Sequence, residues 1–296
     1  MAIETLLAAP GVAVIDGGLS TQLESMGYHL NDPLWTARAL LDDPDAVVAA
    51  HRAFVEAGAR IVITASYQVS RIGFQAVGLR PGQADEALQA SIEVARRAVD
   101  GTDALVAASV GPYGAIVHDG SEYRGDYGLD EGLLAAFHAE RIEVLTQAAP
   151  DLIAVETIPD VVEARALAQV LPAGLPAWVC FTAKDDASLR AGQAIEEAIA
   201  VVAGQPSVIA VGVNCTEPVH VPGLLRRIRS VTDLPLVAYP NAGGSWDATH
   251  RAWLGPKQPI EQSARAWVAA GAQIVGGCCG TDADDIASLA AAIPAQ

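Results

Sequence analysis

Eight repeats of one unit along the chain constrain its fold most strongly. In each repeat a short apolar stretch ends in small or polar residues, and an alanine-rich amphipathic stretch follows. Continuous apolar stretches of this kind predict parallel strands that are buried on both faces. The predicted strands are Val12–Asp16, Ile61–Ala65, Leu105–Ser109, Leu152–Glu156, Trp178–Thr182, Val208–Asn214, Leu234–Tyr239 and Ile274–Gly277.

The stretches between these strands predict helices. The clearest of them are Pro44–Ala57, Ala84–Val99, Glu131–Ala148, Val161–Val170, Ala194–Val202, Val221–Ser230, Ile260–Ala269 and Asp282–Ala292. Eight strand–helix units in 296 residues predict the α/β class, as a single (β/α)8 TIM barrel. We expect one domain, residues 1–296, because no linker or low-complexity tract divides the chain.

A doubly wound open sheet is the alternative architecture. Such a sheet often has a glycine-rich turn after its first strand, and Asp16-Gly17-Gly18 partly imitates that turn. The spacing G-x-G-x-x-G is missing, however. The barrel is therefore the favoured prediction, with its active site at the C-terminal mouth of the strands.

The charge of the chain excludes some partners. Its formal net charge is −17, and it has only two lysines, Lys184 and Lys257. Nucleic acids and anionic membrane surfaces attract basic patches, so neither is an expected partner. No apolar run reaches the roughly 18–20 residues that span a bilayer, and the N-terminus has no secretory-signal pattern. We expect a cytoplasmic protein; nothing in the sequence decides its oligomeric state.

Two long loops follow predicted strands, Gly111–Asp130 and Pro240–Pro259. Loops of this length without their own periodicity tend to be functional in a compact domain. In a barrel both would lie over the C-terminal mouth, where the active site is expected.

Three cysteines stand at strand ends. Cys278 and Cys279 lie between glycines in the pentapeptide Gly276–Gly280, and Cys215 follows the sixth predicted strand. Glycine lets the backbone leave strand geometry, so that both neighbouring sulfurs can face one point. The pattern predicts a zinc site with three thiolate ligands and one open position, which is typical of catalytic zinc. Buried inert thiols, or a disulfide between the two adjacent cysteines, are the alternatives. Cys180 lies inside an apolar strand and is predicted to be a core residue.

Acidic residues also end two of the strands. Asp16 ends the first strand and Glu156 the fourth, and a buried carboxylate is costly unless it meets a cation or a hydrogen-bond donor. An amino group of a ligand would satisfy both. Gly17 and Gly18 could offer backbone N–H groups to a carboxylate, and hydroxyl groups follow the second strand in Thr64–Tyr67. Together with a metal for sulfur, these groups describe a site for a thiol-bearing amino acid.

Motifs along nearly the whole chain carry a resemblance to a known family. The chain is similar to the homocysteine S-methyltransferases, within the zinc-dependent group that includes betaine–homocysteine methyltransferase. The matching segments run from Asp16 to Gly280 and are DGGLSTQLESMG, NDPLW, TASYQ, SVGPYG, DGSEYRGDY, ETIP, GVNC, YPNAG and GGCCG. The pair GVNC and GGCCG is highly specific, and NDPLW and DGSEYRGDY resemble the branch that uses S-methylmethionine.

The resemblance implies a barrel fold and a Zn²⁺ ion held by Cys215, Cys278 and Cys279. The family's contacts to the homocysteine amino group fall on Asp16 and Glu156. Its other substrate contacts fall on the set Gly17, Gly18, Ser66 and Asn214. In the betaine branch a tyrosine follows the strand-4 glutamate and approaches the metal, but Thr157 stands there in this chain, so the fourth ligand of the resting site stays open.

The resemblance implies methyl transfer from a sulfonium donor to the thiolate of L-homocysteine, which forms methionine. S-methylmethionine, S-adenosylmethionine and betaine remain open as donors. Other activities in view are a zinc barrel hydrolase and a non-catalytic protein that stores zinc or binds thiols. The hydrolase would normally use histidine ligands, and the six histidines form no H-x-H or H-E-x-x-H pattern. Candidates for the cationic donor pocket are Trp35, Tyr113, Glu122, Tyr123, Asp126, Tyr127, Tyr239 and Trp246.

Overall fold

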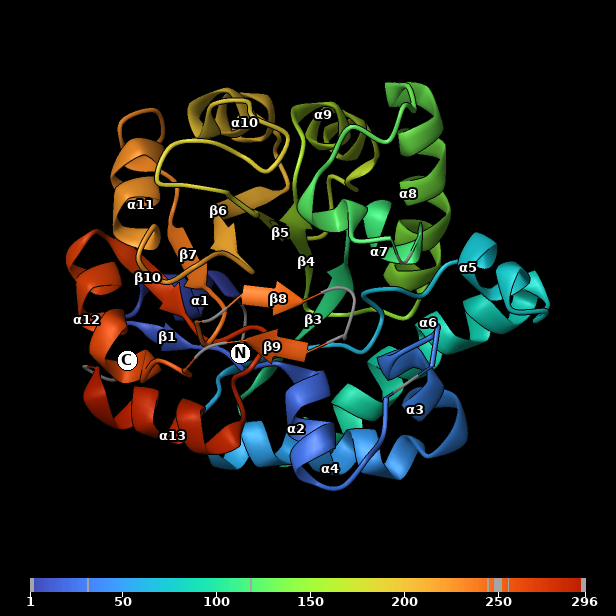
Figure 1. Cartoon of the computed structure of the whole chain (residues 1–296). Coiled ribbons are helices and arrows are strands. Elements are labelled where there is room, and N and C mark those ends of the chain that lie inside the picture. The colour runs from blue at the N-terminus through green and yellow to red at the C-terminus, as the bar shows by residue number, and fades with distance from the viewer. Residues whose placement is uncertain are drawn as a thin grey trace.

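A parallel eight-stranded barrel forms the centre of the computed structural model (Figure 1). The structure describes residues 3–30, 32–117, 119–243, 245–247, 252–254 and 256–293. The sheet order is β1-β10-β7-β6-β5-β4-β3-β2, and every neighbouring pair is parallel. Ile15, just after β1, forms a parallel bridge with Ile61 of β2. This bridge joins the two ends of the sheet, so the predicted TIM barrel is confirmed.

The barrel strands fall where the apolar stretches predict them. Their bounds are β1 Ala13–Val14, β2 Ile61–Ile63, β3 Leu105–Val110, β4 Leu152–Ile158, β5 Ala177–Phe181, β6 Val208–Asn214, β7 Leu236–Tyr239 and β10 Ala272–Val275. Strands β3, β4 and β5 are buried along their whole length, as expected for strands covered on both faces.

Helices surround the barrel (Figure 1). All eight predicted helices are present, and their bounds are α4 Pro44–Glu56, α6 Pro81–Val99, α8 Glu131–Gln147, α9 Val161–Val170, α10 Ile195–Val202, α11 Val221–Arg229, α12 Ile260–Ala269 and α13 Ala283–Ala292. An aspartate precedes α4, α8, α9 and α13, and in each case its side chain accepts a backbone N–H of the first turn. These caps explain why the helices begin where they do.

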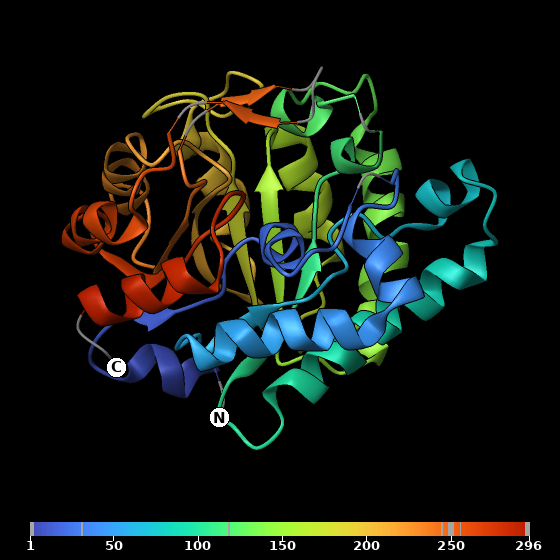
Figure 2. The same cartoon turned by 60° about the horizontal axis from the view of Figure 1, so that its bottom comes forward.

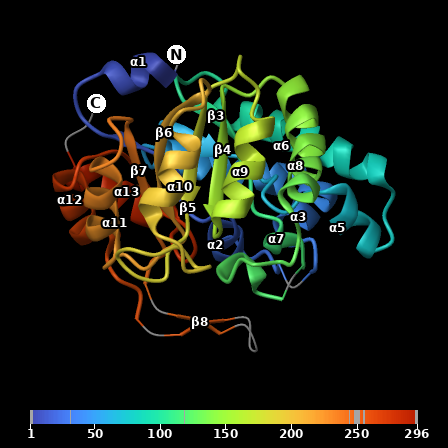
Figure 3. The same ribbon diagram turned by 90° about the horizontal axis from the view of Figure 1, so that it is seen from above.

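Several short elements were not predicted. They are α1 Ile3–Ala8, α2 Leu19–Ser25, α3 Thr36–Asp42, α5 Arg71–Ala76, α7 Gly114–Val117, the 3₁₀ turn η1 Ser121–Tyr123, and the antiparallel hairpin of β8 Ser245–Asp247 and β9 Ala252–Leu254. The two long loops thus contain structure of their own. Figures 2 and 3 show the hairpin and α1 at opposite ends of the barrel.

The core has two parts. The larger part fills the space between strands and helices, and the smaller part fills the barrel interior. Ile3 and Leu6 of α1 belong to the interior part and are each 1% exposed, so α1 closes the end of the barrel opposite the hairpin. Cys180 also lies in the interior and is fully buried, as predicted. Within the described ranges, no helix combines the length and the apolar character that crossing a membrane requires.

Candidate active site

Three cysteine sulfurs meet at the C-terminal mouth of the barrel. The sulfurs of Cys215, Cys278 and Cys279 all lie within 4.8 Å of one another. Cys215 and Cys278 form a disulfide, with Cα atoms 5.7 Å apart, and the Cys279 sulfur lies 3.9 Å from that of Cys215. Two ligands at the usual Zn–S length in a tetrahedral site would be about 3.8 Å apart. The cluster therefore fits a metal once the disulfide is reduced.

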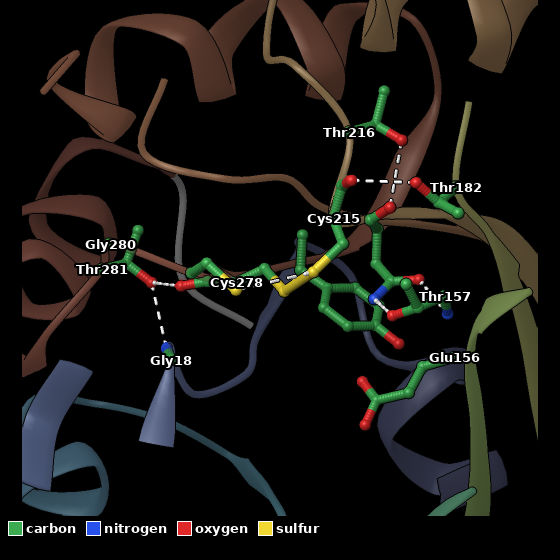
Figure 4. Close-up of a disulfide and its surroundings, with 12 residues drawn as sticks. Gly18, Glu156, Thr157, Thr182, Cys215, Thr216, Cys278, Gly280 and Thr281 are labelled. Carbon is green, nitrogen blue, oxygen red and sulfur yellow. Dashed lines mark hydrogen bonds between the residues drawn. A yellow bond between two sulfur atoms is a disulfide. The ribbon is translucent and has the colours of Figure 1, made fainter. Parts of the chain in front are cut away.

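The disulfide differs from the pairing considered in the sequence. It joins Cys215 after β6 to Cys278 after β10, and the adjacent Cys278 and Cys279 are not joined to each other. Figure 4 shows it with Glu156 and Thr157 on one side and Thr281 on the other. The same three sulfurs thus have an oxidised arrangement and, after reduction, an arrangement suited to metal binding.

Glycines let the loop after β10 pack against the end of β1. A Cβ atom on Gly18 would lie 2.6 Å from the Cys278 carbonyl oxygen, and one on Gly276 would lie 2.3 Å from Ile15. The Gly277 N–H donates to the Asp16 carbonyl at 3.0 Å. Close backbone approach is thus the physical role of these glycines, and it holds both cysteines of the loop beside Asp16.

Two residues at the site adopt left-handed backbone conformations that side chains normally avoid. Thr157 has φ 62° and Cys215 has φ 44°. For a β-branched residue such as threonine this conformation is a genuine outlier. The strain falls on the residue after Glu156 and on a cysteine of the cluster, and strain of this kind concentrates at functional sites.

Asn214 holds the strained Thr157 with two hydrogen bonds. The Thr157 N–H donates to Asn214 Oδ1 at 2.6 Å, and Asn214 Nδ2 donates to Thr157 Oγ1 at 2.8 Å. Both residues are buried. The Asn214 side chain is thus occupied within the protein, and it orients Thr157 between the glutamate of β4 and the cysteine after β6. Its predicted contact with substrate stays a prediction.

Asp16 presents an unpaired carboxylate oxygen. Its Oδ2 accepts the Ile63 N–H at 2.7 Å, whereas Oδ1 is buried without a hydrogen-bond partner among the described residues. Burial raises the pKa of Asp16 well above its ordinary value, and the charge of Glu156 raises it further. Because an unpaired buried acid is costly, this oxygen fits a cationic ligand group such as an ammonium.

Glu156 lies close enough to Asp16 for their charges to interact. Burial raises the pKa of Glu156 to about 7, against hydrogen bonds from Ser109 and Tyr239 that lower it. The Ser109 hydroxyl donates to Glu156 Oε1. Two neighbouring carboxyls with raised pKa values, and with no ion pair to either of them among the described residues, would suit an amino group of a ligand.

The groups predicted to contact a ligand carboxylate differ in how many hydrogen bonds they already make within the protein. The Gly18 N–H donates to the carbonyl and hydroxyl oxygens of Thr281, at 3.0 and 3.1 Å, so it is already used. The Ser66 hydroxyl donates to the Ser109 carbonyl at 2.8 Å and lies 2.8 Å from the Thr64 hydroxyl. Gly17 donates no hydrogen bond within the described chain. Its N–H is therefore the freest of the three groups for a ligand carboxylate.

The third sulfur lies against a tyrosine. Burial raises the pKa of the Cys279 thiol to about 11, against the nearby Tyr123 hydroxyl, which lowers it. The protein alone therefore keeps Cys279 protonated at neutral pH. A cation placed among the sulfurs would favour the thiolate.

Few of the candidate donor residues reach the cluster. Tyr123 touches Cys279, and the charge of Glu122 acts on the same sulfur. Trp35 packs edge-on against Tyr67 at 6.4 Å, and Tyr67 hydrogen-bonds Thr157. Tyr239 lies in the barrel interior below the cluster, where its carbonyl accepts the Cys215 N–H at 3.3 Å. The remaining candidates do not reach the cluster: Tyr113 and Tyr127 pack around Phe137 and Glu163, and Asp126 is exposed. The Trp246 side chain is outside the described residues.

Two buried acids and one buried arginine were missed in the sequence. Glu163 accepts hydrogen bonds from the Tyr113 N–H at 2.6 Å and the Tyr127 hydroxyl at 3.0 Å, and it pairs with His138. Asp160 accepts the Asp126 N–H at 3.0 Å. Both acids thus fasten the loop 111–130 to the start of α9.

Arg141 fastens the other side of the mouth. It donates to the carbonyl oxygens of Ser66, Tyr67 and Gly111, at 3.2, 2.7 and 2.9 Å. The sequence could have predicted that Arg141 lies on a helix among apolar residues. Its carbonyl partners could not be predicted, because they depend on tertiary structure.

Comparison with known proteins agrees with this geometry. The family model described as homocysteine S-methyltransferase matches residues 13–293. The homocysteine S-methyltransferase of Escherichia coli (strain K12) is 40% identical over 302 residues, which cover 98% of this chain and 97% of that protein.

Two crystal structures of the homocysteine methyltransferase MmuM from Escherichia coli are also similar. The metallated form has a TM-score of 0.88 at 39% identity and covers 98% of this chain and 99% of that one. The oxidised form has a TM-score of 0.84 at 39% identity and covers 95% of each chain. This chain belongs to the homocysteine S-methyltransferase family and is a methyltransferase of that type.

Proposed function

We propose that the protein transfers a methyl group from a sulfonium donor, S-methylmethionine first, to L-homocysteine and so forms methionine. The observation that carries the proposal is the three-sulfur cluster near two buried acids, Glu156 and Asp16, of which Asp16 has a carboxylate oxygen without a hydrogen-bond partner among the described residues. The sulfurs suit a metal that binds the acceptor's sulfur, and the acids suit its amino group. Residues 1–296 would then form one homocysteine-binding barrel domain.

The proposed metal is Zn²⁺, held by Cys215, Cys278 and Cys279. The spacing of the sulfurs and the soft thiolate ligand set support zinc. The metallated form of the Escherichia coli relative supports a metal in this family. When bound, the ion would lower the pKa of the homocysteine thiol, so that the acceptor binds as a thiolate.

The residues of the chain orient the acceptor. Asp16 and Glu156 take its ammonium group, and the free Gly17 N–H supports its carboxylate. The thiolate sulfur then attacks the methyl carbon of the donor, a new C–S bond forms, and the old C–S bond breaks. The electron pair of the broken bond returns to the donor's sulfur, which becomes a neutral thioether. With S-methylmethionine both products are methionine, and no redox cofactor takes part.

A reducing compartment fits this chemistry. Metal binding needs three reduced cysteines, and the structure shows that two of them can form a disulfide. We therefore propose that the enzyme acts in the cytoplasm, where thiols are kept reduced.

The test is methionine formation by the reduced, zinc-loaded protein, with homocysteine and each of S-methylmethionine, S-adenosylmethionine and betaine. The expected result is turnover with S-methylmethionine. Turnover only with betaine would overturn the sulfonium donor, and turnover with none of them would overturn the methyltransferase. The variant Cys278→Ala should lose both zinc and turnover while remaining folded.

A further inference from the structure

Near the mouth of the barrel lies a third acid, partly buried, beyond the two that the homocysteine amino group needs. Asp16 and Glu156 are the two acids already assigned, and Glu122 of η1 is the third. Glu122 Oε2 is buried and has no hydrogen-bond partner in the described part of the chain. Burial raises the pKa of Glu122, its own backbone N–H lowers it, and the charge of Asp119 raises it further. A buried carboxylate oxygen without a partner is costly, so this position fits a cationic ligand.

The backbone fixes Glu122 at this position. A Cβ atom on Gly114 would lie only 2.4 Å from the Glu122 nitrogen, so the first residue of α7 packs directly on η1. The Ser121 hydroxyl donates to the Gly114 carbonyl at 3.4 Å, and the left-handed Gly120, with φ 77°, begins the turn. The carboxylate is therefore carried by a tightly packed turn.

Glu122 lies near the sulfur cluster. Its charge raises the pKa of Tyr67, Tyr123 and Cys279, so the carboxylate is within electrostatic reach of all three. The ring of the next residue, Tyr123, lies under the Arg190 guanidinium at 5.6 Å. Arg190 Nε donates to the Thr182 hydroxyl at 3.3 Å, and that hydroxyl donates to the Cys215 carbonyl at 2.9 Å, so Tyr123 lies near the cluster. The turn thus presents a carboxylate and an aromatic ring beside one sulfur of the cluster.

The other two acids are held by different elements. Asp16 accepts the Ile63 N–H of β2, and Glu156 accepts hydrogen bonds from Ser109 of β3 and from Tyr239. Both therefore belong to the ends of barrel strands, whereas Glu122 belongs to the loop over the mouth. This separation suits two ligands with separate positive charges.

The reaction itself requires a positive charge near the cluster. In-line attack places the donor's sulfonium sulfur one methyl group away from the acceptor's sulfur, which lies at the metal. That sulfonium must leave water, and a carboxylate together with tyrosine rings can replace its hydration. We infer that Glu122 receives the positive sulfur of the methyl donor, with Tyr67 and Tyr123 beside it. This inference rests on the proposed function and assigns its donor subsite.

The test compares Glu122→Gln with the wild type in steady-state kinetics. Glutamine keeps the shape and removes the charge, so the KM for S-methylmethionine should rise at least about tenfold while the KM for homocysteine changes by less than about twofold. The control Glu93→Gln, which removes an exposed charge from α6, should change neither constant.

Product inhibition distinguishes a charge effect from a structural one. Methionine resembles the donor but has a neutral sulfur, so its inhibition constant against S-methylmethionine, at saturating homocysteine, should change less than about twofold in Glu122→Gln. An unchanged donor KM would overturn the inference. An equal rise of the KM for the donor and of the inhibition constant of methionine would also overturn the inference. That result would indicate that Glu122 contacts the donor's amino group, or that the variant has lost structure generally.

A second variant covers the case in which glutamine disturbs folding. Glu122→Asp keeps the charge on a shorter side chain, and its donor KM should lie between those of the wild type and Glu122→Gln. An aspartate variant as impaired as the glutamine variant would contradict a role for the charge. Failure of the wild type to use any sulfonium donor would instead overturn the proposed function, so the two failures are distinguishable.

Discussion

Asn214 and Thr157 exchange two hydrogen bonds across the mouth of the barrel, and this pair holds the strained backbone between Glu156 and the cysteine cluster. Asn214 ends β6 immediately before Cys215, and Thr157 follows Glu156 in β4. One amide side chain therefore links the strand that carries Glu156 to the strand that leads into Cys215.

Asn214→Ala should damage both stability and substrate binding. The substitution leaves the buried Thr157 N–H without a partner and removes one hydrogen bond from the Thr157 hydroxyl, which should lower the free energy of unfolding by about 1–3 kcal/mol. Urea unfolding and calorimetric titration with homocysteine measure the two effects. An alanine variant with wild-type stability and wild-type homocysteine affinity would contradict the role of the pair.

Glu156→Gln should stabilise the protein in the absence of substrate. The folded-state pKa of Glu156 is about 7, above its ordinary value of 4.5, so the folded protein favours the protonated form. Below pH 4.5 this carboxyl is protonated in both states and does not lower the free energy of unfolding. As the pH rises from 4.5 to 7, it lowers the free energy of unfolding by a growing amount. Glutamine cannot ionise, so above pH 7 the free energy of unfolding of the variant should exceed that of the wild type by on the order of 3 kcal/mol.

Unfolding curves at pH 5 and pH 8 test this prediction, since the gain should be much larger at pH 8. The same variant should bind homocysteine more weakly, because the ammonium loses a charged partner. A variant with the same stability difference at both pH values would show that Glu156 is not held in its protonated form by burial.

Gly18→Ala should disturb the cysteine loop. The new Cβ would lie 2.6 Å from the Cys278 carbonyl oxygen, so β1 and the loop after β10 must separate. The expected result is less than one zinc bound per chain after reduction and loading, measured by elemental analysis. Gly82→Ala is the matched control, because a Cβ there meets nothing within 4 Å, and it should retain full zinc.

Glu163→Gln should affect the methyl donor more than homocysteine. Glu163 is buried and accepts hydrogen bonds from the Tyr113 N–H and the Tyr127 hydroxyl, which fasten the loop that carries Glu122. A glutamine side chain has one oxygen where glutamate has two, so it cannot accept from both donors, and the Tyr127 hydroxyl would have to turn and accept from the amide. The KM for S-methylmethionine should rise by about tenfold or more, with the KM for homocysteine nearly unchanged. Equal effects on both substrates would indicate a general loss of structure.

The sequence predicted the barrel well because each strand is a continuous apolar stretch and each main helix has an amphipathic pattern. The short elements α1 and α2 were missed, since six or seven residues are too few to show helical periodicity. The hairpin was missed because its strands, Ser245–Asp247 and Ala252–Leu254, are only three residues long.

The site was predictable where one residue type carries the chemistry. Cysteines and acids at strand ends, such as Cys215 and Asp16, were expected at the mouth of the barrel, and the structure places them there; their roles stay predictions. The roles of Glu163 and Arg141 could not be predicted, because both lie on helices and their partners come from distant loops. The disulfide between Cys215 and Cys278 also depends on tertiary geometry, since 63 residues separate the two cysteines.

The central claim is that the cysteine cluster holds a metal that activates the acceptor thiol. The most direct measurement follows a labelled methyl group from S-methylmethionine to homocysteine with the reduced protein, before zinc removal, after it, and after zinc is restored. The account predicts labelled methionine with zinc, none without it, and recovery on restoration. Full methyl transfer by the zinc-free protein would contradict the account.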